Sequence, residues 1–292
     1  MAKVLHRLKR YGESERILQE LLQSPIKTDV VVVELHLWLA KVLVAMGKEE
    51  SAKALLLGII KEDARYQDSK QLNLALTRLL EGQGQWEEST NHLERVMAFD
   101  PADPDVLASL AANYFYSEQP ELAVMCYERL LDLGHCTASI WNNYALSKFY
   151  SGDFDQVYEC FEEAIGAAVQ DTEHADLWFN ISQVAVCCGD LEWARSCLQL
   201  ATHYEPGHAE SLNNMGVMGD DGGLSDCRRL FEQSCKKGSG LFEPFYNLAM
   251  LERSEGRLES ALANARKAHS NYPMHRGCQS MIEGLLSEIN EF

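Results

Sequence analysis

A short phrase recurs along this chain at spacings close to 34 residues, and it constrains the fold more than any other feature. In each copy a glycine is followed by a polar residue and, five positions after the glycine, by a small or short apolar residue. The copies are "AMGKEESA" (45–52), "GQGQWEES" (82–89), "YSGDFDQV" (150–157), "CCGDLEWA" (187–194) and "SEGRLESA" (254–261). The first four glycines are 37, 68 and 37 residues apart, and 68 is twice 34. Such a period indicates a stack of small repeated units.

Apolar residues recur at helical spacing before and after each glycine, which indicates helix–turn–helix units. The first helix carries a large residue and, three positions later, an apolar–small pair, as in Trp141 with Tyr144 and Ala145. The second carries a small residue and an apolar one four positions later, as in Ala194 and Leu198. All seven prolines fall at expected boundaries, helix starts or turns, where they do not interrupt a helix. These features predict an all-α fold, a right-handed α-solenoid of about seven tetratricopeptide (TPR) repeats with a C-terminal capping helix.

We divide the chain into a weak N-terminal hairpin, the repeats and the cap. The hairpin spans 1–32, with Gly12 in its turn and a second helix that ends at Pro25, and the capping helix spans 276–292. The seven repeats are predicted at 33–66, 70–103, 104–137, 138–171, 175–208, 209–241 and 242–275. Three residues are inserted around 171–174, and one is deleted near "GDDGG" (219–223).

The third repeat has no turn glycine. Glu118 stands in its place, two residues before Pro120. Proline suits the first position of a helix because its missing N–H would have no helical partner there. We therefore expect the second helix to begin at Pro120. We also expect the turn at Glu118 to follow a different path, with Gln119 extended before the proline.

Charge and cysteine usage limit the kinds of partner and the cellular compartment that the chain is expected to have. The net charge is −18, so nucleic acid is a poor partner and a basic or neutral peptide suits the surface better. Nine scattered cysteines without a Cys-x-x-Cys pair indicate a reducing compartment with buried thiols. No apolar run is long enough for a membrane span, and the first residues lack a signal-peptide core. A cytoplasmic protein is expected.

No enzyme or metal signature is present in the sequence. The phosphate-binding, dinucleotide-binding, zinc-protease and serine-hydrolase motifs are all missing. The segment "GDDGG" lacks the alternating ligands and final glutamate of a calcium loop. His203 and His208 flank a repeat boundary with no third ligand nearby, so a boundary role is expected for them. We therefore predict a protein without cofactor, metal or catalytic residues.

A column of four asparagines is the strongest candidate site. Asn143, Asn180, Asn214 and Asn247 each precede the apolar–small pair of a first helix, at spacings that follow the insertion and the deletion. In a TPR stack this position faces the concave groove, where regularly spaced amides can bond the backbone of an extended peptide. The alternative is that each amide bonds a neighbouring helix. Trp38, Ala75 and Ser109 interrupt the column in the first three repeats, so the groove would serve the C-terminal half.

Aromatic residues supply weaker candidates. Trp141, Trp178, Phe154 and Phe161 stand at packing positions and are expected in the core. Tyr114, Phe115 and Tyr116 are consecutive, so at least one of them should be exposed. Tyr116 and Trp193 are possible partner contacts. No lysine flanks the asparagine column, which disfavours the carboxylate-gripping TPR grooves of the heat-shock chaperone type.

Longer stretches carry a closer resemblance. They are "NYFYSEQPELAVMCYERLLDLG" (113–134), "WNNYALSKFYSGDFD" (141–155), "ADLWFNISQVAVCCGDLEWARSCLQLA" (175–201), "HAESLNNMGV" (208–217) and "EPFYNLAMLERSEGRLESALANARKA" (243–268). These stretches resemble the C-terminal TPR region of one family of Bardet–Biedl syndrome proteins, the TPR-containing eighth of the set. The short "GVMGDDGGLSDC" segment and the start of the chain depart from the family, whose members carry additional N-terminal sequence.

The resemblance implies a scaffold subunit of the BBSome, the coat-like complex that carries membrane proteins to and from cilia. It implies other BBSome subunits as partners: another TPR subunit, the β-propeller subunits and a small extended subunit in the groove. It implies membrane contact only through the complex, and a place at the cilium, basal body and centriolar region. Two other hypotheses stay open: a general TPR adaptor in another assembly, and the regulatory part of an enzyme such as a glycosyltransferase.

Overall fold

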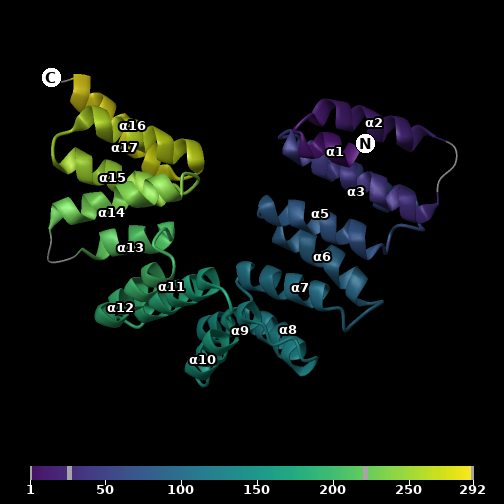
Figure 1. Ribbon diagram of the computed structural model, residues 1–292, viewed down its shortest axis with the longest axis horizontal. Helices are drawn as coiled ribbons and strands as arrows, with labels where there is room; N and C mark the ends of the chain where they lie inside the picture. The colour runs from purple at the N-terminus through teal and green to yellow at the C-terminus, as the bar shows by residue number, and fades with distance from the viewer. Residues whose placement is uncertain (1, 25–27, 220–222, 291–292) are drawn as a thin grey trace. The chain divides into compact units, whose positions relative to one another are not determined.

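The computed structural model describes residues 2–24, 28–219 and 223–290. Within these ranges the chain forms helices and no strand (Figure 1). The helices are α1 (Ala2–Arg7), α2 (Tyr11–Gln23), α3 (Asp29–Ala45), α4 (Glu49–Glu62), α5 (Lys70–Gly82), α6 (Trp86–Met97), α7 (Pro104–Tyr116), α8 (Pro120–Asp132), α9 (Ala138–Ser151), α10 (Val157–Ala167), α11 (Asp171–Cys187), α12 (Leu191–Tyr204), α13 (Ala209–Met218), α14 (Leu224–Lys237), α15 (Glu243–Ser254), α16 (Leu258–Asn271) and α17 (Arg276–Asn290). The predicted fold class, an all-α solenoid of TPR helix pairs, is confirmed.

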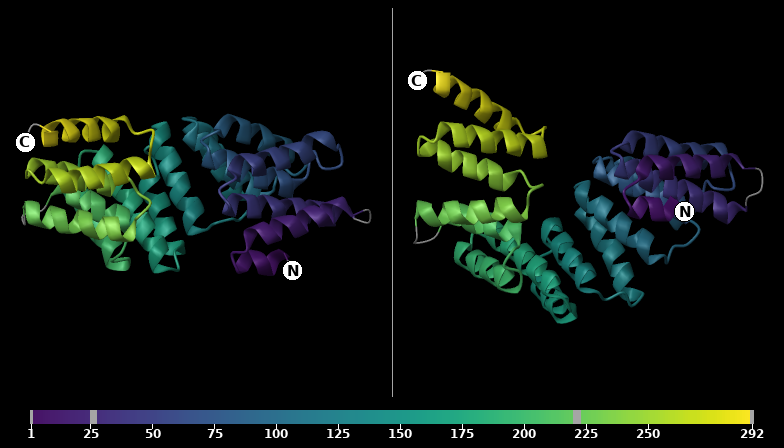
Figure 2. Two further views of the ribbon diagram at one scale, coloured as in Figure 1. Left: turned by 90° about the horizontal axis from the view of Figure 1, so that it is seen from above. Right: turned by 45° about the horizontal axis from the view of Figure 1, so that its top comes forward.

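The helices belong to two compact units. Unit 1 comprises residues 1–136 and 147–154, and unit 2 comprises residues 137–146 and 155–292, so the division falls within α9. In each unit, helices consecutive in the chain pack against one another, as α7 with α8 and α15 with α16 do (Figure 2). This nearest-neighbour packing is the property that the 34-residue period predicts.

Small residues let the paired helices approach. The second-helix pairs expected from the sequence are buried, with Ala52, Leu56, Ala194 and Leu198 each 0% exposed. A helix pair occupies each predicted repeat, with α3 beginning four residues earlier than expected, at Asp29. The division into seven repeats stays a prediction.

Residues 171–174, around which the three residues are inserted, form the first turn of α11. Two of the segments discussed above, Pro25 and residues 220–222 of the shortened turn, lie outside the described residues.

The turn of the third repeat corrects one expectation. Glu118 has φ +60°, the same left-handed conformation as the turn glycines Gly47 and Gly189, so its turn follows the common path. Gln119 has φ −121° and ψ 59° and is therefore not fully extended. Pro120 begins α8, as predicted. A glycine is favoured at the position of Glu118 because a side chain strains the left-handed conformation.

The N-terminal hairpin shows the same substitution. Its left-handed residue is Lys9, with φ +57°, and Gly12 lies inside α2. The prediction that Gly12 forms this turn was therefore wrong. Gly12 is the glycine nearest the turn. A search for glycine alone could not find a turn whose left-handed residue is a lysine.

We expect Glu118→Gly to raise the free energy of unfolding by about 0.5–1 kcal/mol, the left-handed strain relieved minus the entropy that glycine loses on folding. Gly189→Ala is the matched reverse change, because no atom lies within 4 Å of the added Cβ and only the backbone conformation is penalised. It should lower the free energy of unfolding by about 1 kcal/mol. Chemical denaturation followed by circular dichroism measures both; a loss of stability in Glu118→Gly would contradict the strain argument.

The cysteines fit the expectation of buried thiols only in part. Cys160, Cys197 and Cys278 are buried, and burial raises the pKa of the Cys197 thiol to about 11. Cys136 and the adjacent pair Cys187 and Cys188 are exposed, contrary to that expectation. None of the nine cysteines, all of which lie in the described residues, forms a disulfide.

Candidate peptide-binding groove

A groove of about 690 Å³ lies in unit 2 at the N-terminal ends of three first helices, α9, α11 and α13. Its walls include asparagine side chains from α9 and α11 and the start of α13 at His208 and Ala209. First helices begin next to one another in this unit because each helix pair packs on the pair before it. The fold therefore gathers residues about 34 positions apart at one place.

The structure brings two of the four predicted asparagines into this groove. Asn143 and Asn180 line it, whereas Asn214 on α13 and Asn247 on α15 stand outside its walls. Asn143 is exposed, and the other three side chains are half-buried. The predicted column is thus divided into a groove pair, Asn143 with Asn180, and a following pair, Asn214 with Asn247.

Two asparagines that the sequence analysis did not select join the members of each pair. The Asn142 amide donates to Oδ1 of Asn143 at 3.0 Å, and the Asn180 amide donates to Oδ1 of Asn142 at 3.1 Å. The same arrangement recurs one step further, where Asn213 donates to Asn214 at 3.1 Å and Asn247 donates to Asn213 at 2.9 Å. The doublets "NN" at 142–143 and 213–214 were the available signal.

These bonds support the alternative interpretation for two of the four asparagines, and peptide binding stays a prediction. Asn180 and Asn247 do bond a neighbouring first helix, as the alternative held. An amide has two donor hydrogens and an acceptor oxygen, and this bond uses one donor hydrogen of Asn180. Asn142, only 9% exposed, holds both groove amides in fixed orientation. A peptide backbone would therefore meet preorganised amides, which lowers the entropic cost of binding.

Acidic side chains dominate the charge of the groove. Glu173, Asp176, Glu205 and Glu210 line it, and Lys237 is the one lysine or arginine among its lining residues. The backbone N–H groups of Val169 and Gln170 donate to Glu173 and lower the pKa of its carboxyl, which keeps it ionised. A segment that carries lysine or arginine complements such walls.

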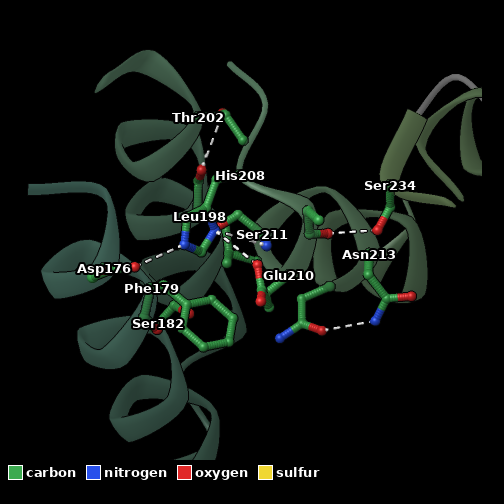
Figure 3. Close-up of polar contacts among 12 residues, drawn as sticks. Asp176, Phe179, Ser182, Leu198, Thr202, His208, Glu210, Ser211, Asn213 and Ser234 are labelled. Atoms are coloured by element: carbon green, nitrogen blue, oxygen red, sulfur yellow. Dashed lines mark hydrogen bonds and ion pairs between the residues drawn. The ribbon is translucent and has the colours of Figure 1, made fainter. Parts of the chain in front are cut away.

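His208, one of the residues that line the groove, contacts both α11 and α13 (Figure 3). It is 7% exposed and caps α13, since its Nδ1 accepts from the backbone N–H of Ser211 at 3.2 Å. Its Nε2 lies 3.2 Å from Asp176 on α11, so the ring joins two consecutive first helices. An Nδ1 acceptor places the proton on Nε2, where it is donated to Asp176. The boundary role expected for His208 is therefore confirmed, and His203 is exposed.

Replacing His208 with alanine is expected to lower the free energy of unfolding by about 1 kcal/mol, because α13 loses its cap. His208→Asn should recover most of that loss, since an asparagine oxygen can accept from the same N–H. Thermal and chemical denaturation of the three proteins distinguish the cap from the hydrogen bond to Asp176. If asparagine restores nothing, the contact with Asp176 rather than the cap stabilises this boundary.

Neither aromatic candidate is among the residues that line the groove. Trp193 on α12 is 39% exposed, and Tyr116 at the end of α7 in unit 1 is 61% exposed. Tyr116 is thus the exposed member expected from the three consecutive rings. Phe154, expected in the core, is 66% exposed, and that prediction was wrong. Trp141 and Trp178 are half-buried and Phe161 is buried, as packing positions predict.

Metal and membrane chemistry find no support in the described part of the chain. No group of three or more histidine, cysteine, aspartate or glutamate side chains is arranged to hold a metal ion in the ranges given above. None of the helices in those ranges is long and apolar enough to cross a membrane.

Solved structures with the same helix arrangement identify the fold. Yeast Tom70 matches 97% of this chain and 60% of its own at a TM-score of 0.73 and 12% sequence identity. A tetratricopeptide repeat protein from Parabacteroides merdae matches 87% of this chain and 98% of its own, with a TM-score of 0.62 and 12% identity. The fold is that of the tetratricopeptide repeats. At these identities the likeness concerns the TPR fold alone.

Curated relatives carry a narrower resemblance, although no family model matches the chain. Tetratricopeptide repeat protein 8 of Mus musculus is 28% identical over 287 residues, 98% of this chain and 54% of its own length. The Homo sapiens protein of that name is 29% identical over 287 residues, 98% of this chain and 51% of its own. The TPR chain thus spans about half the length of these relatives. Since tetratricopeptide repeat protein 8 is the eighth Bardet–Biedl syndrome protein, the predicted resemblance is confirmed.

Proposed function

We propose that this TPR chain is a non-enzymatic scaffold subunit of the BBSome that contributes to the trafficking of membrane proteins to and from cilia. The resemblance to tetratricopeptide repeat protein 8 supports the complex, and the TPR fold supports a role in protein–protein contact. The proposed partners are another TPR subunit, the β-propeller subunits and a small extended subunit. The proposed location is the cytoplasm at the cilium, basal body and centriolar region.

One observation carries the proposed mode of binding. The groove of unit 2 is lined by two amides bonded to Asn142, one on α9 and one on α11, and by four carboxylates. Fixed amides bond a peptide backbone whatever its side chains, and the carboxylates select for basic residues along it. The groove therefore holds an extended, lysine- or arginine-bearing segment of a partner subunit.

Affinity purification tests the proposal. The tagged chain is expressed in ciliated cells, and co-purified proteins are quantified by mass spectrometry against a tag-only control. Recovery of several BBSome subunits in similar amounts is expected. Recovery of no BBSome subunit would refute the proposal, and a different stable set of cytosolic proteins would favour a general TPR adaptor.

A further inference from the structure

Six aromatic rings form a continuous chain of contacts at the turns within the repeats of unit 1. Trp86 stacks on Tyr116 with ring centroids 4.9 Å apart, Phe115 meets Tyr150 at 5.5 Å, and Phe149 meets Phe154 at 5.5 Å. Contacts between the sequence neighbours Phe115–Tyr116 and Phe149–Tyr150 connect these pairs. We call this set, Trp86, Phe115, Tyr116, Phe149, Tyr150 and Phe154, the aromatic strip.

Half of the strip faces solvent. Tyr116 is 61% exposed, Tyr150 53% and Phe154 66%, whereas the other three rings are half-buried. The strip comes from the end of α7, the end of α9, the start of α6 and one loop, so it crosses three repeats. Isolated exposed aromatic residues are ordinary, but contiguous exposed rings mark interaction surfaces, where tyrosine and tryptophan supply much of the binding energy.

The segments that carry the strip are acidic. Within unit 1 these segments, 82–90, 115–122 and 149–154, contain five acidic residues and no lysine or arginine. The acidic residues are Glu87, Glu88, Glu118, Glu121 and Asp153. Lys53 pairs with Glu88 at 3.2 Å and Lys148 pairs with Asp153 at 2.7 Å, which neutralises two of the five. The turn surface is therefore aromatic with a negative border.

Exposed rings with an acidic border disfavour a second copy of this chain as the partner and favour a segment that carries arginine. A second copy of the chain would bring two negative borders together in a symmetric contact, which like-charge repulsion disfavours. Arginine suits both features, because its planar guanidinium stacks on tyrosine and tryptophan faces and pairs with carboxylates at the same time. We propose that the aromatic strip binds a partner segment in which arginine side chains stand beside apolar residues. This surface belongs to unit 1 and does not depend on the groove proposed in unit 2.

Differential selection of displayed peptides tests the inference. Random 12-residue peptides on phage are selected on the immobilised chain and, in parallel, on a Tyr116→Ala/Tyr150→Ala variant. Peptides that bind the wild type but not the variant should be enriched in arginine next to apolar residues. Synthetic copies should lose at least tenfold in affinity on the variant and about fivefold when citrulline replaces arginine, because citrulline keeps the shape and lacks the charge.

Controls separate the strip from general loss of structure. Phe99→Ala removes another exposed ring of unit 1, 69% exposed, and should leave binding unchanged. Glu87→Gln/Glu121→Gln keeps every ring and should weaken binding and its dependence on salt. Three results would overturn the inference: no peptide sensitive to the tyrosine variant, sensitive peptides without arginine enrichment, or self-association in sedimentation velocity that the tyrosine variant abolishes.

Discussion

Glu252→Ala is expected to lower the free energy of unfolding by about 2–3 kcal/mol, because it removes a buried carboxylate to which the half-buried side chains of Arg228 and Asn264 are bonded. Glu252 on α15 is 5% exposed. Its carboxylate accepts from Ser260 at 2.7 Å and Asn264 at 2.8 Å on α16, and pairs with Arg228 of α14 at 3.4 Å. One side chain thus connects three consecutive helices of unit 2.

Glu255→Ala is the matched control. Glu255 pairs with the same Arg228 and with Arg257, but its side chain is 27% exposed and water can replace the bonds. A much smaller loss than that of Glu252→Ala is expected for it, because solvent screens an exposed ion pair. Urea denaturation gives the two values, and hydrogen exchange shows whether protection falls first in α14, α15 and α16. Equal, small losses in both variants would show that Glu252 does not stabilise this junction.

The double change Asn180→Ala/Asn214→Ala is expected to weaken partner binding with little loss of folding. An amide bond to a peptide backbone contributes about 1 kcal/mol, so losing the bond from Asn180 lowers affinity roughly fivefold. Asn180 lines the groove and Asn214 does not, so the single change Asn180→Ala should produce nearly all of the effect. The amount of each partner retained on the tagged variants in ciliated-cell extract measures this.

Asn91→Ala controls for amide loss in general, because Asn91 is an exposed residue of α6 in unit 1. It should retain the partners as the wild type does. Thermal unfolding should show a small loss of stability for Asn180→Ala, since Oδ1 of Asn142 no longer receives the hydrogen bond from Asn180. Unchanged partner recovery in the double variant would contradict the peptide-binding role of the asparagines.

The fold could be predicted because features within a few residues of sequence specify the repeat. Glycine, proline and the small–apolar spacing each specify a turn or a helix face over a few residues, and the helix pairs observed follow them. Where another residue takes over a local role, the prediction failed: Lys9 and Glu118 adopt the left-handed conformation that glycine usually supplies.

The site was predicted less completely, because its bonds join residues about 34 positions apart. The register of the asparagines was visible, but the bond from Asn180 to Asn142 depends on how α9 and α11 pack. The acidic walls depend on which helix starts and loops meet at the groove. The prediction that Phe154 lies in the core failed because of the loop that follows the turn glycine. This loop delays the start of α10 to Val157, and the ring of Phe154 within it is exposed.

Site-specific photo-cross-linking tests the central claim, that the groove of unit 2 holds an extended segment of a partner subunit. A benzophenone amino acid replaces Ser139, an exposed residue of the groove wall, in the tagged chain in ciliated cells. The same amino acid at Phe99 in unit 1 is the control. We predict one dominant cross-linked BBSome subunit at position 139, and its yield should fall several-fold when Asn180→Ala is added. No cross-link at 139, or the same products at 139 and 99, would contradict the account.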